Sequence, residues 1–118
     1  MQDNLIIEKK TINGIDCIHF NFTGRFTEEN AINSIVKWKE MLENQNTKIA
    51  HVWNCLQMKG YEPMARISWQ KAIKELKDKI GTIWLITESS IILAGASIIS
   101  LFTSMNIRTV KTEDDIKN

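Results

Sequence analysis

The sequence predicts a single α/β domain, spanning residues 1–118, with a mixed β-sheet and three main helices. Its 118 residues suffice for one domain and leave little for a second. An Asn13-Gly14 dipeptide between two strand-like stretches is typical of an N-terminal β-hairpin. After it, apolar residues with helical spacing alternate with short apolar runs, which predicts the order β-β-α-β-α-β-α-β. We expect the helices mainly on one face of the sheet, or on both.

The predicted hairpin joins a short strand at 5–7 to a longer strand at 12–22. Apolar and polar residues alternate from Ile18 to Phe22, which is the period of a strand. Segment 23–26 is expected to break this strand before the first helix begins.

The first helix is expected to begin after Thr27, a residue type that often caps helix N-termini. Glu28 and Glu29 follow in the first turn, where the helix dipole favours acidic side chains. Apolar residues with helical spacing then run from Ala31 to Leu42 and indicate one buried face.

The run 49–56 carries few charges and is apolar on both faces, which favours a central strand. A loop is expected at 57–62. Pro63 begins the second helix, because proline is favoured at the first helical position. The apolar stripe of this helix reaches Ile80, and Gly81 is expected to end it.

The remaining elements are a strand at 82–87, a third helix and a short edge strand at 107–111. Ser89 or Ser90 is expected to cap the third helix, which should run from Ile91 to about Met105. This run has no charge, and its 15 residues are too few to span a membrane. We therefore expect no stable membrane insertion.

The helix 91–105 is apolar nearly all round, and such a helix is normally buried on more than one side. In so small a domain, one of those sides needs a cover from outside the chain. The pattern predicts that a second copy of the chain, as a homodimer, or another protein covers it.

The charge balance argues against a nucleic-acid partner. The chain carries 15 Lys and Arg against 14 Asp and Glu. Nucleic-acid-binding proteins usually show a basic excess or a basic stripe. The lysines of segment 71–79 alternate with acidic residues and indicate a solvated helix face.

Cysteine usage indicates a reducing compartment. Cys17 and Cys55 lie far apart in strand-like stretches, without metal-ligand spacing. Segment 1–4 lacks the basic and apolar regions of a signal peptide. We expect a cytoplasmic protein with free, buried thiols.

Three stretches carry a resemblance to a known family: Phe22 to Thr27 before the first helix, His51 to Leu56 with its loop and helix, and 83–87 with its helix of small residues. In order and length, these elements resemble the STAS domain and the bacterial anti-sigma factor antagonists. Segment 58–66 is similar to small bacterial STAS-like proteins of unassigned activity. The resemblance implies a STAS-like fold and regulatory binding of a protein partner.

The family hallmark is an Asp-Ser pair at the junction of the third strand and the second helix, and a partner kinase phosphorylates its serine. Here the junction is 60–64, and it contains neither serine nor threonine. Ser68 lies about one turn too late. We therefore expect no phosphorylation switch at this place.

No local motif indicates catalysis, so we expect neither an enzyme nor a cofactor or metal site. His19 and His51 fall on predicted strands without a nucleophile or orienting acid beside them, and are interpreted as structural. The paired carboxylates at 28–29 and 114–115 are explained by the helix dipole and a solvated tail.

The candidate binding site surrounds segment 57–66, because ligands of open α/β sheets tend to bind beyond the carboxyl ends of strands. Tyrosine and arginine often dominate interfaces, and exposed methionine suits an adaptable apolar surface. An ordinary polar loop with a tyrosine lid over the core explains the same residues equally well. The candidate residues are Asn54, Met58, Tyr61, Glu62, Met64, Arg66, Thr87, Glu88 and Ser89.

Three functions remain open at this point. The first is a protein-interaction module, regulatory in the STAS manner without the serine switch. The second is a carrier of a small molecule or lipid, since an apolar helix beside a sheet can open a pocket. The third is an enzyme whose site has no recognisable motif.

Overall fold

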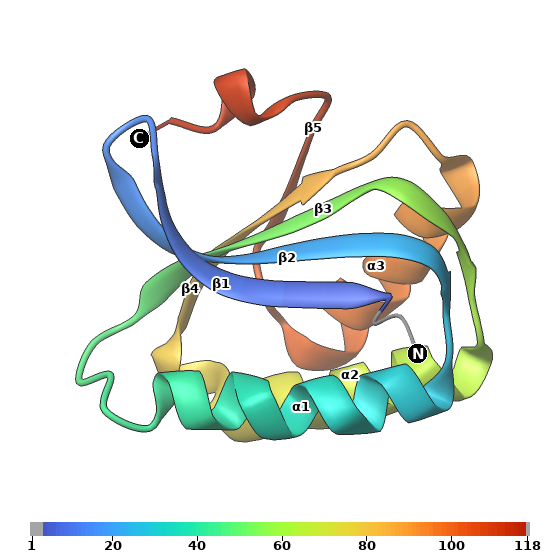
Figure 1. Ribbon diagram of the computed structural model, residues 1–118, viewed down its shortest axis with the longest axis horizontal. Coiled ribbons are helices and arrows are strands. Elements are labelled where there is room, and N and C mark those ends of the chain that lie inside the picture. The colour runs from blue at the N-terminus through green and yellow to red at the C-terminus, as the bar shows by residue number, and fades with distance from the viewer. Residues whose placement is uncertain (1–3, 118) are drawn as a thin grey trace.

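The computed structural model describes residues 4–117 and shows a five-stranded sheet with three α-helices (Figure 1). The strands are β1 (Leu5–Ile12), β2 (Ile15–Phe26), β3 (Ile49–Tyr61), β4 (Ile80–Ile86) and β5 (Ile107–Val110). The helices are α1 (Glu28–Leu42), α2 (Pro63–Leu76) and α3 (Ser90–Thr103), with short 3₁₀ turns at Lys77–Lys79 and Glu113–Asp115. The predicted order of elements is confirmed.

The sheet order β1-β2-β3-β4-β5 follows the order of the chain. β1 pairs antiparallel with β2, and the other neighbours are parallel, so the sheet is mixed as expected. Each helical crossover moves one strand further in the same direction, and such crossovers are right-handed. All three helices therefore lie on one face of the sheet (Figure 1). β5 lies at an edge, as expected.

The hairpin turn forms where the sequence predicts it. Asn13 and Gly14 have φ angles of 50° and 81°, and Ile12 pairs with Ile15 across the turn. Thr27 caps α1 through a capping box with Asn30, as its position predicts.

Two expected loops are strands, because they pair with each other. β2 continues through 23–26, and β3 continues through 57–61 and ends at Tyr61, which pairs with Phe26. Gly24, with a φ angle of 66°, lies at a register shift between the two strands. A glycine in a strand pattern suggests that the strand ends there, but here Gly24 permits a bulge within a longer strand.

The second helix is shorter than expected. α2 ends at Leu76, and a 3₁₀ turn leads into Ile80, the first residue of β4. Gly81 therefore lies in a strand and ends no helix. A Cβ atom there would approach the backbone of Ile49 to 3.3 Å, so this glycine permits close strand contact.

The main core lies between the sheet and the helices and is rich in aromatic rings. Trp38 of α1 and Trp69 of α2 have ring centroids 4.7 Å apart, and both meet Phe20 of β2 edge to face. Rings in this geometry add stabilisation beyond their buried area. Both tryptophans are core residues.

The C-terminal segment covers part of the opposite face of the sheet. Ile116 is only 1% exposed and packs in a small cluster with Cys17, Val52 and Trp84. The side chain of Asn13 donates a hydrogen bond to the carbonyl of Ile116 over 2.8 Å. The hairpin turn thus anchors the end of the chain. Within 4–117, no helix is long and apolar enough to cross a membrane.

Candidate functional site

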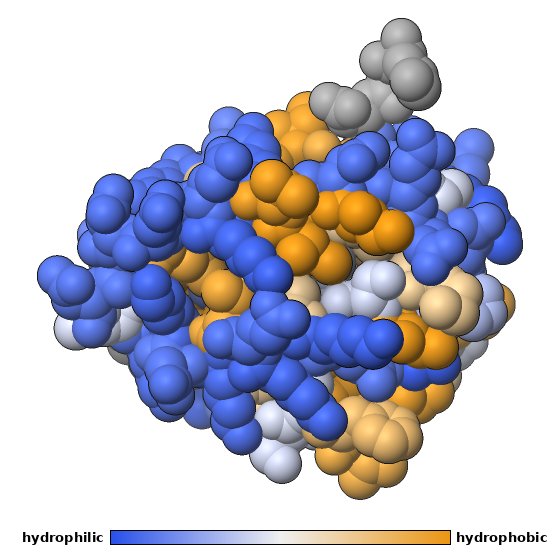
Figure 2. Space-filling view, turned by 90° about the horizontal axis from the view of Figure 1, so that it is seen from below, coloured by the Kyte–Doolittle hydropathy of each residue, from blue (hydrophilic) through white to orange (hydrophobic). Residues whose placement is uncertain are grey.

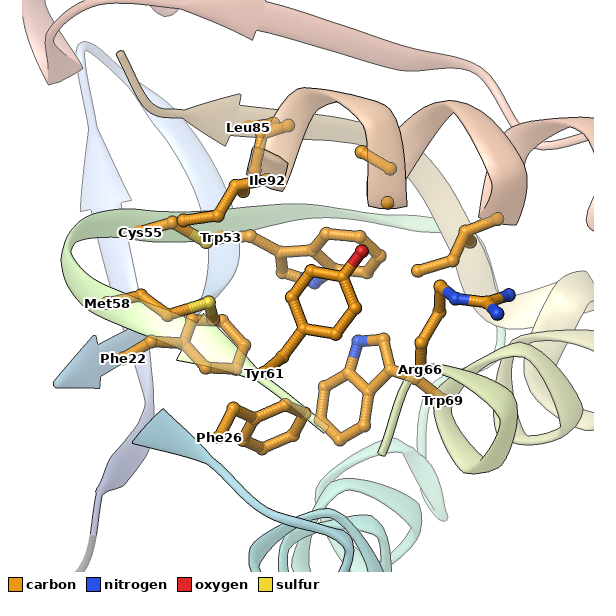
Figure 3. Close-up of a pocket in the computed structure, with 13 residues that line it drawn as sticks. Phe22, Phe26, Trp53, Cys55, Met58, Tyr61, Arg66, Trp69, Leu85 and Ile92 are labelled. Atoms are coloured by element: carbon orange, nitrogen blue, oxygen red, sulfur yellow. The ribbon is translucent and has the colours of Figure 1, made fainter. Parts of the chain in front are cut away.

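An apolar pocket opens between the far end of β3 and the helices α2 and α3 (Figure 3). Its cavity measures about 60 Å³. The long β3 contributes Trp53, Cys55, Met58 and Tyr61 to the wall, because the strand extends into the segment expected to be a loop and bends over the core. The lining residues are Phe22, Phe26, Trp53, Cys55, Met58, Tyr61, Arg66, Trp69, Leu85, Ile92, Gly95, Ala96 and Ile99.

Tyr61 lies across this pocket and packs against α3. A Cβ atom added to Gly95 would lie 2.4 Å from the phenol oxygen of Tyr61, closer than real Cβ contacts come. Only glycine at this place lets the ring lie so near the helix axis. The pair Tyr61 and Gly95 therefore forms a close contact between β3 and α3.

Few polar atoms face the pocket. The indole nitrogen of Trp53 is buried and has no hydrogen-bond partner among residues 4–117. Arg66 stands at the edge of the pocket, and its guanidinium donates to the side chain of Gln70 within α2. The cavity is therefore an apolar space, with one unpaired donor buried in a lining residue and one cation at its edge.

Three of the predicted site residues, Met58, Tyr61 and Arg66, come together at this pocket. Met64 lies nearby in sequence but is exposed on α2. Glu62 has a different task, since its carboxylate accepts a hydrogen bond of 2.7 Å from the backbone N–H of Glu28. It thereby ties the start of α2 to the start of α1.

The remaining predicted residues do not join the pocket. Asn54 follows Trp53 in β3, so it points to the other face of the sheet. Thr87 and Ser89 shape the start of α3: Thr87 accepts from the N–H of Ser89, and Ser89 caps the helix by accepting from Ile92. Glu88 between them is exposed. The strand order never reverses, so the sheet lacks the crevice that gathers such residues in doubly wound folds.

Most of the pocket wall was not predicted as a site. Trp53 and Trp69 fit a core interpretation equally well, and both are core residues as well as lining residues. The one available signal was the run Ala94 to Ala96, where small residues thin α3 on one side. A helix face made of small residues indicates that another side chain approaches closely, but it does not identify that side chain.

The outward face of α3 is the second candidate surface. Its apolar side chains are well exposed: Leu101 by 80%, Ile91 by 68% and Phe102 by 57%. With Leu93 and Ile98, also exposed, they form what we name the α3 outer face. α3 contains no charged residue. Figure 2 shows the face of the molecule seen from below, where hydrophobic residues form several areas between hydrophilic ones.

His51 makes structural contacts in the core. Trp38 donates from Nε1 to Nε2 of His51 over 3.0 Å, and Nδ1 of His51 lies 2.8 Å from the carbonyl of Ile49. Burial lowers the pKa of His51 to about 4, so the ring is neutral at pH 7. His19 lies on the opposite face, where burial also lowers its pKa, and its Nε2 is 3.7 Å from Glu113.

No group of three potential metal ligands occurs in the part of the chain that the structure describes. Both cysteines are buried, and burial raises the pKa of each thiol, that of Cys17 to about 11. Such thiols are poor nucleophiles at neutral pH.

Comparison with solved structures defines the fold. An uncharacterized protein of the DUF3478 family from Shewanella loihica PV-4, described as having a SpoIIAA-like fold, superposes with a TM-score of 0.79. The match covers 98% of this chain and 92% of the other, at 13% sequence identity. This chain has a SpoIIAA-like fold. No protein-family model and no curated protein matches the sequence.

The SpoIIAA-like fold is the anti-sigma factor antagonist fold, so the resemblance stated from the sequence is confirmed at the level of fold. The junction of the third strand and the second helix is, in the structure, the end of β3 and the start of α2. In this chain it contains Gly60, Tyr61 and Glu62, followed by Pro63. Ser68 lies inside α2, beyond the first turn.

Proposed function

We propose that this protein is a non-enzymatic, regulatory interaction module that binds a protein partner through the α3 outer face. One observation supports the proposal: five large apolar side chains of an uncharged helix are exposed together. Contiguous exposed apolar surface is unusual on soluble domains and often marks an interaction site. The absence of serine and threonine from segment 60–64 supports binding without a phosphorylation switch there.

The partner that we propose first is a second copy of the chain. Two α3 outer faces can meet around a two-fold axis without bringing like charges together, because neither face has a charge. Each helix would then cover the exposed side chains of the other. This arrangement also agrees with the apolar character of the helix on all sides.

The test introduces one charge on the α3 outer face and the same charge elsewhere. Phe102 on α3 and Val36 on α1 are both 57% exposed, so F102E and V36E form a matched pair. We expect sedimentation velocity at micromolar concentration to show a dimer for the wild type and for V36E, and a monomer for F102E. A buried, unpaired carboxylate would disrupt the interface.

A wild-type protein that sediments as a monomer throughout would contradict self-association. Native mass spectrometry of the protein purified from its own host then tests for a different partner chain. If F102E and V36E affect that complex equally, α3 is not the interface and the proposal is wrong.

A second function, carriage of a small apolar molecule, is favoured by the pocket beneath Tyr61. Aromatic and aliphatic side chains enclose it, and few polar groups reach it, as in many ligand sites. A bound molecule that leaves on denaturation, detected in the same native mass spectra, would support this function.

We also propose that the protein resides in a reducing compartment, the cytoplasm. Cys17 and Cys55 belong to separate clusters of buried residues, and both are free thiols. Buried free thiols fit a reducing environment best.

A further inference from the structure

We propose that the pocket beneath Tyr61 binds a small, neutral, apolar molecule with a carbonyl oxygen, and that Trp53 donates a hydrogen bond to that oxygen. This inference rests on the second function above, carriage of a small molecule, and names its ligand class. It is independent of the α3 outer face.

The unpaired indole of Trp53 is the main observation. Trp53 is 3% exposed, and its Nε1 has no acceptor among residues 4–117. Buried tryptophan N–H groups usually find a partner, as Trp38 does with His51. Figure 3 shows the indole nitrogen of Trp53 on the side of the ring that faces Tyr61 and Trp69. A ligand with an acceptor atom would satisfy this donor.

The walls of the pocket select an apolar ligand body. Phe22, Phe26 and Trp69 present aromatic rings, and Leu85 and Ile92 add aliphatic surface. Such walls favour an aromatic or short aliphatic body through burial of apolar surface.

The charges around the pocket favour a neutral acceptor over a carboxylate. Arg66 is the single charged residue among those lining the cavity, and its guanidinium is bonded to Gln70 at the edge. A carboxylate beside Trp53 would therefore be buried without a cation, which opposes its binding. A carbonyl oxygen accepts the same hydrogen bond without this penalty.

Tyr61 has to move when a ligand enters. The cavity of about 60 Å³ is smaller than the roughly 150 Å³ that accommodates benzene in an apolar protein cavity. Tyr61 is only half-buried and covers the pocket from β3, so rotation of its ring enlarges the space. Tyr61 thus acts as a gate, with Gly95 providing the surface on which the gate closes.

Three probes of similar shape test the inference on the wild-type protein. Acetophenone has the carbonyl, α-methylstyrene replaces it with a methylene group, and benzoate has a charge. The four tryptophan indole signals of ¹⁵N-labelled protein report the site. We expect acetophenone to shift the Trp53 signal downfield, and to leave Trp38, bonded to His51, and Trp84, on the other face, unmoved.

One hydrogen bond should make acetophenone bind about 5- to 10-fold more tightly than α-methylstyrene, with benzoate weaker than both. W53F should remove this preference, so that acetophenone and α-methylstyrene bind the variant with equal affinity, whatever its value. W84F is the matched control, because Trp84 packs on the opposite face of the sheet. If W53F does not fold, the order of the three probe affinities on the wild-type protein still tests the inference.

The outcomes separate the two proposals. Equal binding of acetophenone and α-methylstyrene, or an unmoved Trp53 signal, would overturn the carbonyl inference while leaving carriage of apolar molecules intact. No binding of any probe up to its solubility limit would overturn both.

Discussion

His51 sits at the centre of the core with both ring nitrogens in use. Nδ1 carries the proton, because it faces the carbonyl of Ile49, and Nε2 accepts from Trp38. The two bonds and full burial select one neutral tautomer. A buried polar side chain whose atoms are all satisfied adds specificity to an otherwise apolar core.

The neutral His51 predicts loss of stability in acid. Its pKa is about 4 in the folded chain and 6.5 ordinarily. As the pH falls from 6.5 towards 4, the unfolded chain binds a proton that the folded chain does not. The free energy of unfolding should therefore fall, by on the order of 3 kcal/mol from this residue.

Urea unfolding between pH 7 and pH 4 measures this loss. H51Q is the control variant, since an amide can accept from Trp38 and donate to Ile49 without titrating. The variant should show a shallower pH dependence than the wild type. The same pH dependence in both proteins would mean that other groups, such as His19, dominate.

At the scale of elements, the pocket forms because β3 and α3 make close contact. β3 reaches the pocket only because it pairs with β2 as far as Phe26, and α3 approaches only because Gly95 has no side chain. Neither condition is visible in the local pattern of one element. The site depends on two elements meeting.

A double-mutant cycle tests this contact. G95A should destabilise the wild-type chain by about 1–3 kcal/mol, because the new Cβ displaces the ring of Tyr61. In a Y61A background the clash is gone, so the same change should stabilise α3 by up to about 1 kcal/mol through helix propensity. Urea unfolding of the four proteins measures the coupling. If G95A changes the free energy of unfolding equally in both backgrounds, the contact between Tyr61 and Gly95 is not tight.

At the scale of the whole molecule, the two faces of the sheet are covered differently. Three helices cover one face, and the C-terminal segment with Ile116 covers part of the other. A monotonic strand order with right-handed crossovers requires this asymmetry. The second face therefore depends on a few residues at the end of the chain.

I116A should cost about 2–4 kcal/mol, because it removes a side chain that is 1% exposed from the smaller cluster. It should also open Cys17, a member of that cluster, to a thiol reagent. Cys55, in the helical core, should stay protected. K117A, at an exposed position, is the control. Equal labelling of the two thiols in I116A would indicate general unfolding instead.

Part of the candidate site followed from the sequence. Met58, Tyr61 and Arg66 were predicted together and line one pocket. Asn54 was expected beside them, but the period of two in a strand turns it to the other face. The sequence could not identify Trp53 and Trp69 as pocket residues, because a tryptophan that lines a cavity and one that fills a core have the same sequence pattern.

The sequence by itself determined the order of the elements, the hairpin turn at Asn13 and Gly14, and the cap of α1 at Thr27. These features depend on φ preferences and on hydrogen bonds between residues a few positions apart. Tertiary structure decided how far β2 and β3 extend and that all three helices lie on one face of the sheet. It also decided that Ile116 packs on the other face and that a pocket forms. Each of these features requires pairing or packing between residues far apart in the chain. The periodicity of a local segment does not identify such distant partners.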